Sequence, residues 1–341
     1  MEGIRSIGKA FDTFLNTLGE HMESIYRKWN CWCIVSNDEY IAALGSGVTI
    51  LNRSTLGVVH HFTGIRYIIS GFFVNEDVLV VFTTEQRLYF LKISEKRVLW
   101  SCSRPRQLAS SGDIRCCLIP GTDKIACIAT GKQSLQEHFY LLVDYRQQTV
   151  DVRELPNCYR VVHALVWTQV FGLTFLTYQA NDAGELLYRI NALTEDGDCA
   201  TLLEWESAQL VNAYSGSYLF MNDYGEQEPQ LRVYPLEQLQ QIQYPVLENS
   251  YILPFPSFHS KGPVGSSRLY LPTISWIDED AGLLTACTTD WLGVYDFVDE
   301  KRIAEYNHTN ISCGTIIDEK LLIGCTPGLM IEKLGFSNSN E

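Results

Sequence analysis

Cysteine and histidine are the residues through which this chain could bind a metal ion or perform nucleophilic chemistry. The sequence has 11 cysteines and 7 histidines. Cys31 and Cys33 are separated by one residue, and Cys116 and Cys117 are adjacent, whereas structural zinc sites use C-x2-C pairs or spaced histidines. In a strand, Cys31 and Cys33 would face the same side, as core residues do. We therefore expect no metal site and no cofactor.

A catalytic histidine or serine is the next candidate for chemistry. His163 lies in the apolar run VVHALVW, and on an inner strand it could face a channel and act as an acid, base or ligand. Its apolar neighbours favour a structural position in the core or channel wall. The sequence has no G-x-S-x-G motif and no phosphate-binding glycine loop, the signatures of serine hydrolases and nucleotide-binding enzymes. We expect no catalytic residue.

Net charge and hydropathy restrict the partners and the compartment. Lys and Arg number 26 against 40 Asp and Glu, which gives a formal charge of −14 and predicts no direct nucleic-acid partner, since a phosphate backbone is repelled. No apolar run approaches the roughly 18 residues of a membrane span, and the first residues lack the apolar centre of a signal peptide. Cys127 and Cys287 lie within apolar runs, as free thiols do. We expect a cytoplasmic location and no transmembrane segment.

Several of the cysteines and histidines lie within or beside short apolar runs, which are the predicted secondary-structure elements. From Trp29 onward, runs of four to eight residues such as CWCIVS, DVLVVFTT and RLYFLKI alternate with Asn, Asp, Gly and Ser turns, a pattern typical of an all-β fold. The only later stretch with helical character is LEQLQQIQ at 236–243, so a parallel βαβ sheet is not expected. Residues 1–28 differ, because Ile4, Phe11, Leu18 and Ile25 belong to one stripe at steps of three or four. This period predicts an amphipathic helix over 1–28.

The strands also recur as a unit. An apolar hairpin with a short polar turn, followed by a second strand pair, occurs seven times, and the second pairs begin about 47 residues apart on average. One four-stranded propeller blade takes roughly 40 to 50 residues. We therefore predict a seven-bladed β-propeller over 29–336 and a disordered tail over 337–341, with six or eight blades as alternatives.

Two of these units resemble known propeller repeats. RLYFLKISEKRVLW at 87–100 is similar to the blade hairpin of quinoprotein-like propellers, and TDWLGVYDFVDEKRIAEY at 289–306 resembles the inner and outer strands of WD40 blades. The resemblance covers about 29–336 and places the chain in the β-propeller superfamily. It implies architecture and no chemistry, since no blade closes with Trp-Asp or opens with a clear Gly-His.

Ring closure requires a fourth strand for the last unit. Its three runs end close to Phe336, so we expect a three-stranded last blade or one completed by the N-terminal region. The amphipathic helix would then cover the exposed edge, because uncovered edges promote aggregation.

Carboxylates occupy most of the hairpin turns. If these turns join the two innermost strands of each blade, they all emerge on one face of the ring. That face would gather Asp38, Asp77 and Asp280, together with Glu39, Glu76, Asp123, Asp278, Glu279, Asp318 and Glu319. One interpretation is that Asp and Asn simply favour turns. The other is an acidic rim that attracts a basic surface or peptide with salt-dependent affinity.

The longest interval between units contains a proline-rich insertion over 244–272. Its prolines exclude it from a sheet interior, yet Tyr251, Phe255 and Phe258 are too apolar for a solvated loop. The insertion either packs on the propeller's own surface or is an exposed aromatic docking element for a partner.

These observations favour a non-catalytic protein-interaction scaffold that uses the faces and loops of a propeller, an inference drawn partly from fold analogy. The alternative is an enzyme or small-ligand binder with its site at the mouth of the central channel. A third interpretation is a subunit of a larger assembly, in which the helix and the insertion are both contact surfaces.

Overall fold

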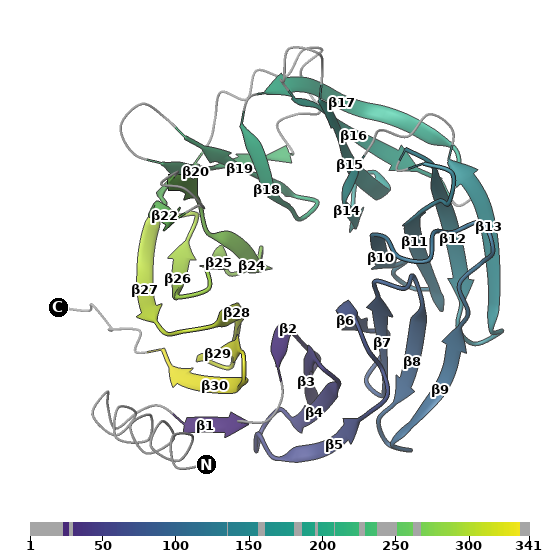
Figure 1. Cartoon of the computed structure of the whole chain (residues 1–341), viewed down its shortest axis with the longest axis horizontal. Helices are drawn as coiled ribbons and strands as arrows, with labels where there is room; N and C mark the ends of the chain where they lie inside the picture. The colour runs from purple at the N-terminus through teal and green to yellow at the C-terminus, as the bar shows by residue number, and fades with distance from the viewer. Residues whose placement is uncertain are drawn as a thin grey trace.

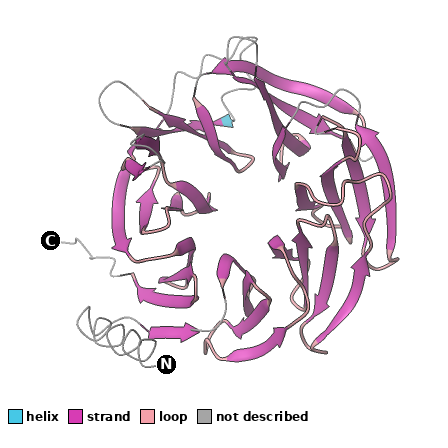
Figure 2. Ribbon diagram, viewed as in Figure 1, coloured by secondary structure: helices cyan, strands magenta, loops and turns pink. Residues whose placement is uncertain are grey.

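Strands make up almost all of the regular structure. The computed structural model describes residues 23–26, 30–134, 136–155, 161–180, 186–194, 197–207, 209–224, 229–236, 251–261 and 267–334. Within these ranges there is no α-helix, and seven four-stranded antiparallel sheets surround one axis (Figure 1). The colouring by secondary structure shows a ring built almost entirely of strands (Figure 2). The predicted all-β fold and the count of seven blades are confirmed.

The first four blades follow the chain in order, each from the innermost strand outward. Blade 1 contains β2 (Cys31–Ser36), β3 (Tyr40–Gly45), β4 (Val48–Asn52) and β5 (Val58–Phe62). Blade 2 contains β6 (Ile68–Phe73), β7 (Val78–Thr83), β8 (Leu88–Lys92) and β9 (Arg97–Cys102). Blade 3 contains β10 (Ile114–Leu118), β11 (Lys124–Thr130), β12 (His138–Asp144) and β13 (Thr149–Leu155). Blade 4 contains β14 (Val161–Thr168), β15 (Gly172–Ala180), β16 (Leu186–Leu193) and β17 (Cys199–Ser207).

The remaining three blades include the two exceptions to a simple repeat. Blade 5 contains β18 (Leu210–Tyr214), β19 (Tyr218–Asp223), β20 (Gln230–Pro235) and β21 (Tyr251–Pro254). A separate hairpin, β22 (Phe258–Lys261) with β23 (Ser267–Tyr270), precedes blade 6. Blade 6 contains β24 (Thr273–Asp278), β25 (Leu283–Cys287), β26 (Trp291–Asp296) and β27 (Lys301–Asn307). Blade 7 contains β28 (Ile311–Ile317), β29 (Lys320–Cys325), β30 (Gly328–Lys333) and β1 (Glu23–Tyr26).

The hydrophobic core lies between blades. Seven clusters of buried residues occur, and each combines side chains from two neighbouring blades around the whole ring. The middle strands are apolar on both sides because each sheet face contacts a neighbour, as in β7, where all six residues are buried. In the outermost strand β9, by contrast, three of six residues are exposed and only one is buried. A single blade could not bury both of its faces, so the ring is the cooperative unit.

Blade 7 is closed by the N-terminal strand. β1 pairs antiparallel with β30, with Glu23 opposite Ile331 and Tyr26 opposite Leu329, and Figure 1 shows β1 lying beside β30 at the edge of that blade. This confirms the N-terminally completed alternative. It corrects the predicted helix at 23–26, because the free backbone groups of β30 offer these residues strand pairing that outweighs their helical period. Residues 1–22 lie outside the described residues.

The proline-rich stretch is partly a blade strand. Its residues Tyr251–Pro254 form β21, which pairs with β20 as the outermost strand of blade 5. Prolines are compatible with this edge position because an outermost strand leaves one row of backbone groups unpaired. Residues 236–250 separate β20 from β21 in sequence. The two strands nevertheless pair antiparallel, as the third and fourth strands of the other blades do.

Candidate interaction face

All seven turns between the first and second strands lie on one face of the ring. We call these the AB turns; they cover 37–39, 74–77, 119–123, 169–171, 215–217, 279–282 and 318–319. Antiparallel pairing also brings the turn between the third and fourth strands to this face. In blade 2, Asp77 of the AB turn accepts hydrogen bonds from the Ser94 backbone N–H at 2.7 Å and the Ser94 hydroxyl at 2.6 Å. We call this surface the AB face.

Six exposed carboxylates crowd the AB turns: Asp38, Glu39, Glu76, Asp280, Asp318 and Glu319. The Asp38 side chain is 99% exposed, and the Arg53 guanidinium lies 3.9 Å from it. The structure therefore gathers Asp38, Asp77 and Asp280 on one face, as their positions in the hairpins predicted.

Two of the predicted carboxylates stabilise the turns themselves. Asp77 is half-buried and its two oxygens are used by Ser94. Asp123 accepts a hydrogen bond from the Tyr145 hydroxyl at 3.2 Å and pairs with Arg146 at 2.9 Å. Both therefore act as turn-stabilising residues, as Asp commonly does. Of Asp38, Asp77 and Asp280, only Asp38 and Asp280 are exposed.

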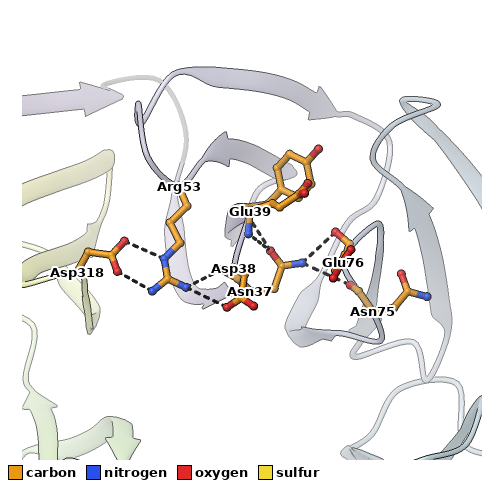
Figure 3. Close-up of polar contacts among 8 residues, drawn as sticks. Asn37, Asp38, Glu39, Arg53, Asn75, Glu76 and Asp318 are labelled. Carbon is orange, nitrogen blue, oxygen red and sulfur yellow. Dashed lines mark hydrogen bonds and ion pairs between the residues drawn. The ribbon is translucent and has the colours of Figure 1, made fainter.

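A hydrogen-bonded chain links the AB turns of blades 7, 1 and 2 (Figure 3). Arg53 donates to both carboxylate oxygens of Asp318, at 2.8 and 2.7 Å, and to the Asn37 carbonyl at 2.7 Å. The Asn37 amide donates onward to the Glu76 carbonyl at 3.0 Å. Hydrogen bonding to Arg53 holds the pKa of the Asp318 carboxyl below its ordinary value. This chain connects three neighbouring turns by hydrogen bonds.

The three predicted aromatic residues lie elsewhere, along the outer part of blades 5 and 6. Tyr251 is half-buried in β21. Phe255 is 3% exposed and lies 5.4 Å from the Tyr295 ring, between centroids. Phe258 packs against Trp291 with centroids 5.6 Å apart. These contacts bury Phe255 in the core between blades 5 and 6. Of the two alternatives for the proline-rich stretch, the structure therefore shows packing on the propeller's own surface at Phe255.

His163 has a structural setting in the innermost strand of blade 4. Its backbone carbonyl accepts a hydrogen bond from Arg115 of blade 3 at 2.9 Å, and its ring contacts the backbone of Asn212 in blade 5. Burial, with the Arg115 charge, lowers the pKa of the imidazole. Among the described residues, no three His, Cys, Asp or Glu side chains are grouped so that they could hold a metal ion.

Comparison with protein families and with curated proteins gives no match to this sequence. The likeness to WD40-like and quinoprotein-like propellers is therefore one of architecture, carried by the seven blades of four strands. No helix within the described ranges has the length and apolarity needed to cross a bilayer.

One AB turn breaks the acidic pattern. In blade 4, Trp167, Val170 and Phe171 are 39%, 60% and 42% exposed. These three residues were not among those predicted from the sequence to form this face. The sequence does contain a signal: the run WTQVF has no carboxylate, whereas the AB turns of blades 1, 2, 3, 6 and 7 each contain at least one Asp or Glu.

Proposed function

We propose that this chain is a non-catalytic protein-interaction scaffold and that its AB face binds a basic segment of a partner protein. The observation that carries the proposal is the convergence of six exposed carboxylates on one face of a chain whose formal charge is −14. Charges arranged in this way attract a complementary surface and increase its association rate.

Hydrogen bonds between neighbouring AB turns support the same function. The Arg53–Asp318 pair and the Asn37 amide hold the turns of blades 7, 1 and 2 in a fixed arrangement. A preorganised surface loses little conformational entropy when it binds. Asp38 and Glu76 are exposed on turns that these hydrogen bonds connect.

A triple variant tests the proposal. Asp38→Asn, Glu76→Gln and Asp280→Asn remove three negative charges from exposed AB-turn positions. Partners recovered with the wild-type chain from native cells and identified by mass spectrometry should be lost with this variant. Their affinity for the wild-type chain should fall as salt is raised from 50 to 500 mM, because exposed charges are screened.

A matched control separates position from total charge. Asp113→Asn, Glu154→Gln and Glu206→Gln also remove three negative charges, from exposed positions outside the AB turns. This control should bind like the wild-type chain. Equal loss of binding in both variants, or an affinity that does not depend on salt, would overturn the proposal.

The cytoplasm is the compartment that we propose for this function. All ten cysteines of the described residues are free thiols, and six of them are buried. Free buried thiols are typical of proteins kept in a reducing compartment. Fractionation of native cells with an antibody to the chain tests this, and recovery in an oxidising compartment would contradict it.

A further inference from the structure

Blade 4 has an apolar AB turn on a face where five of the other six AB turns carry carboxylates. We use the term apolar turn for Trp167, Val170 and Phe171, which are all exposed. Exposed apolar residues are common singly, but Val170 and Phe171 in one tight turn, with Trp167 near the end of the strand before it, form a candidate contact surface. Trp and other aromatic residues also dominate the binding energy of interfaces.

Backbone and hydroxyl contacts fix the apolar turn in its exposed position. The Thr168 hydroxyl accepts a hydrogen bond from the Phe171 backbone N–H at 3.0 Å and lies 3.2 Å from the Gly172 carbonyl. Gly172 has a φ of 69°, in the left-handed region that glycine adopts without strain. On either side, Leu165 and Leu173 are buried in the core between blades 3 and 4. The turn is therefore anchored at both ends, with its apolar side chains left in solvent.

The next two AB turns connect the apolar turn with carboxylates. Gly216 of blade 5 packs so closely on the end of β14 that an added Cβ would lie 3.2 Å from the Thr168 methyl group. The backbone N–H of Ser217, in the same turn, points to the Glu279 carboxylate of blade 6 at 3.4 Å. Asp280 follows and is exposed. Three neighbouring turns thus run from apolar, through small and neutral, to acidic.

We infer that this run of turns is a docking site for a basic peptide segment that carries an aromatic or large aliphatic side chain. The apolar side chain would pack on Val170 and Phe171, beside Trp167, while Lys or Arg residues would face Glu279 and Asp280. The inference rests on the proposed function and specifies where the partner's apolar contact lies.

Charge complementarity selects this occupant over others. A second copy of the chain would bring the same acidic turns against each other, and the formal charge of −14 on each copy opposes that contact. An anionic membrane is repelled for the same reason. A basic segment is attracted to the acidic turn, and its apolar side chain removes the exposed surface of Val170 and Phe171 from water.

Selection from a phage library of random twelve-residue peptides tests the inference with the intact chain. Peptides enriched on the wild-type chain should combine Lys or Arg with Trp, Phe or Leu. Val170→Ser with Phe171→Ser should weaken their binding at least tenfold, as hot-spot truncation does. Trp167 is left unchanged because its ring lies beside Gly172. The control Tyr67→Ser removes a 61% exposed aromatic residue just before β6, on the opposite face, and should leave binding unchanged.

Three outcomes would overturn the inference. If the enriched peptides are basic and sensitive to the AB-face triple variant but unaffected by the Val170 and Phe171 substitutions, the apolar contact is wrong and the proposed function stands. If no basic peptides are enriched, both fail. If the chain instead sediments with phosphatidylcholine vesicles and the double variant abolishes this, the apolar turn contacts a membrane surface. Unchanged circular dichroism of the double variant shows that it remains folded.

Discussion

Arg53 and Asp318 form a bidentate ion pair although 265 residues separate them in sequence. Arg53 follows β4 of blade 1, and Asp318 lies in the AB turn of blade 7. Nε and Nη2 donate to separate carboxylate oxygens at 2.8 and 2.7 Å. The pair therefore crosses the junction at which the first and last blades of the ring meet.

Asp318→Asn should lower the free energy of unfolding by about 0.5–1 kcal/mol, since both side chains are partly exposed and solvent screens the pair. Urea denaturation measures the change. Asp280→Asn is the matched control, because Asp280 lies on the same face and forms no ion pair with any described residue. If Asp280→Asn lowered the free energy of unfolding as much as Asp318→Asn, the effect would come from the loss of one negative charge on this face and not from the ion pair.

The same pair predicts a pH dependence. Arg53 lowers the pKa of Asp318 in the folded state, so the folded chain releases this proton more readily than the unfolded chain. The stabilisation is therefore complete above the unfolded pKa of an aspartate and is lost as pH falls through the lower, folded value. The difference in unfolding free energy between wild type and Asp318→Asn should be constant near pH 7 and shrink in acid. A difference that grows on acidification would contradict the assignment.

Removal of β1 should destabilise the ring. Deleting residues 1–27 removes the strand that pairs with β30, and we expect a loss of about 2–4 kcal/mol from a few backbone hydrogen bonds, together with concentration-dependent aggregation at the exposed edge. Deletion of 1–22 retains β1 and is the control. Thermal unfolding and light scattering measure both effects, and equal stability of the two truncated chains would exclude a closing role for β1.

Tyr214 and Thr174 share a hydrogen bond of 2.7 Å between blades 5 and 4, and both side chains are buried. Tyr214→Phe should cost about 1–2 kcal/mol because the Thr174 hydroxyl loses its short partner. Tyr67→Phe, at an exposed position, should cost nothing measurable. Chemical denaturation of both variants provides the comparison, and equal midpoints would disprove the contribution of this bond.

Burial also raises the pKa of Tyr214 to about 12. The folded chain keeps the phenol protonated at a pH where the unfolded chain loses the proton, so stability should decline as pH rises from about 10, the ordinary tyrosine value, toward 12. Tyr214→Phe should show a shallower alkaline decline. An identical slope in the variant would show that other groups cause the alkaline loss.

Phe255→Ala should reduce the free energy of unfolding by about 3–5 kcal/mol, the range for a large aromatic residue removed from a packed core. Ile252→Ala, in the neighbouring outermost strand at 36% exposure, should cost much less. Urea midpoints distinguish the two variants. A near-neutral Phe255→Ala would mean that this ring is available to a partner and is not required by the core.

Sequence periodicity was sufficient to predict the blades because each strand satisfies a local rule. Runs such as DVLVVFTT are β-branched and aromatic, and the polar residues between them mark turns. The same logic located Asp38, Asp77 and Asp280 in AB turns. It could not separate the turn-stabilising Asp77 from the exposed Asp280, because only the position of a hydrogen-bond donor such as Ser94 distinguishes them.

Long-range pairing decided the rest. The strand at 23–26 has a helical period and becomes β1 only because β30 lies beside it with free backbone groups. β21 follows its partner β20 after an interval of 15 residues, too far for local pattern to connect them. The approach of Gly216 to Thr168 and the contact of Ser217 with Glu279 bring an apolar, a neutral and an acidic turn together, and they depend on how whole blades pack around the axis. Strand identity is therefore a property of neighbouring residues, whereas ring closure and the composition of each face arise from contacts between residues far apart in the chain.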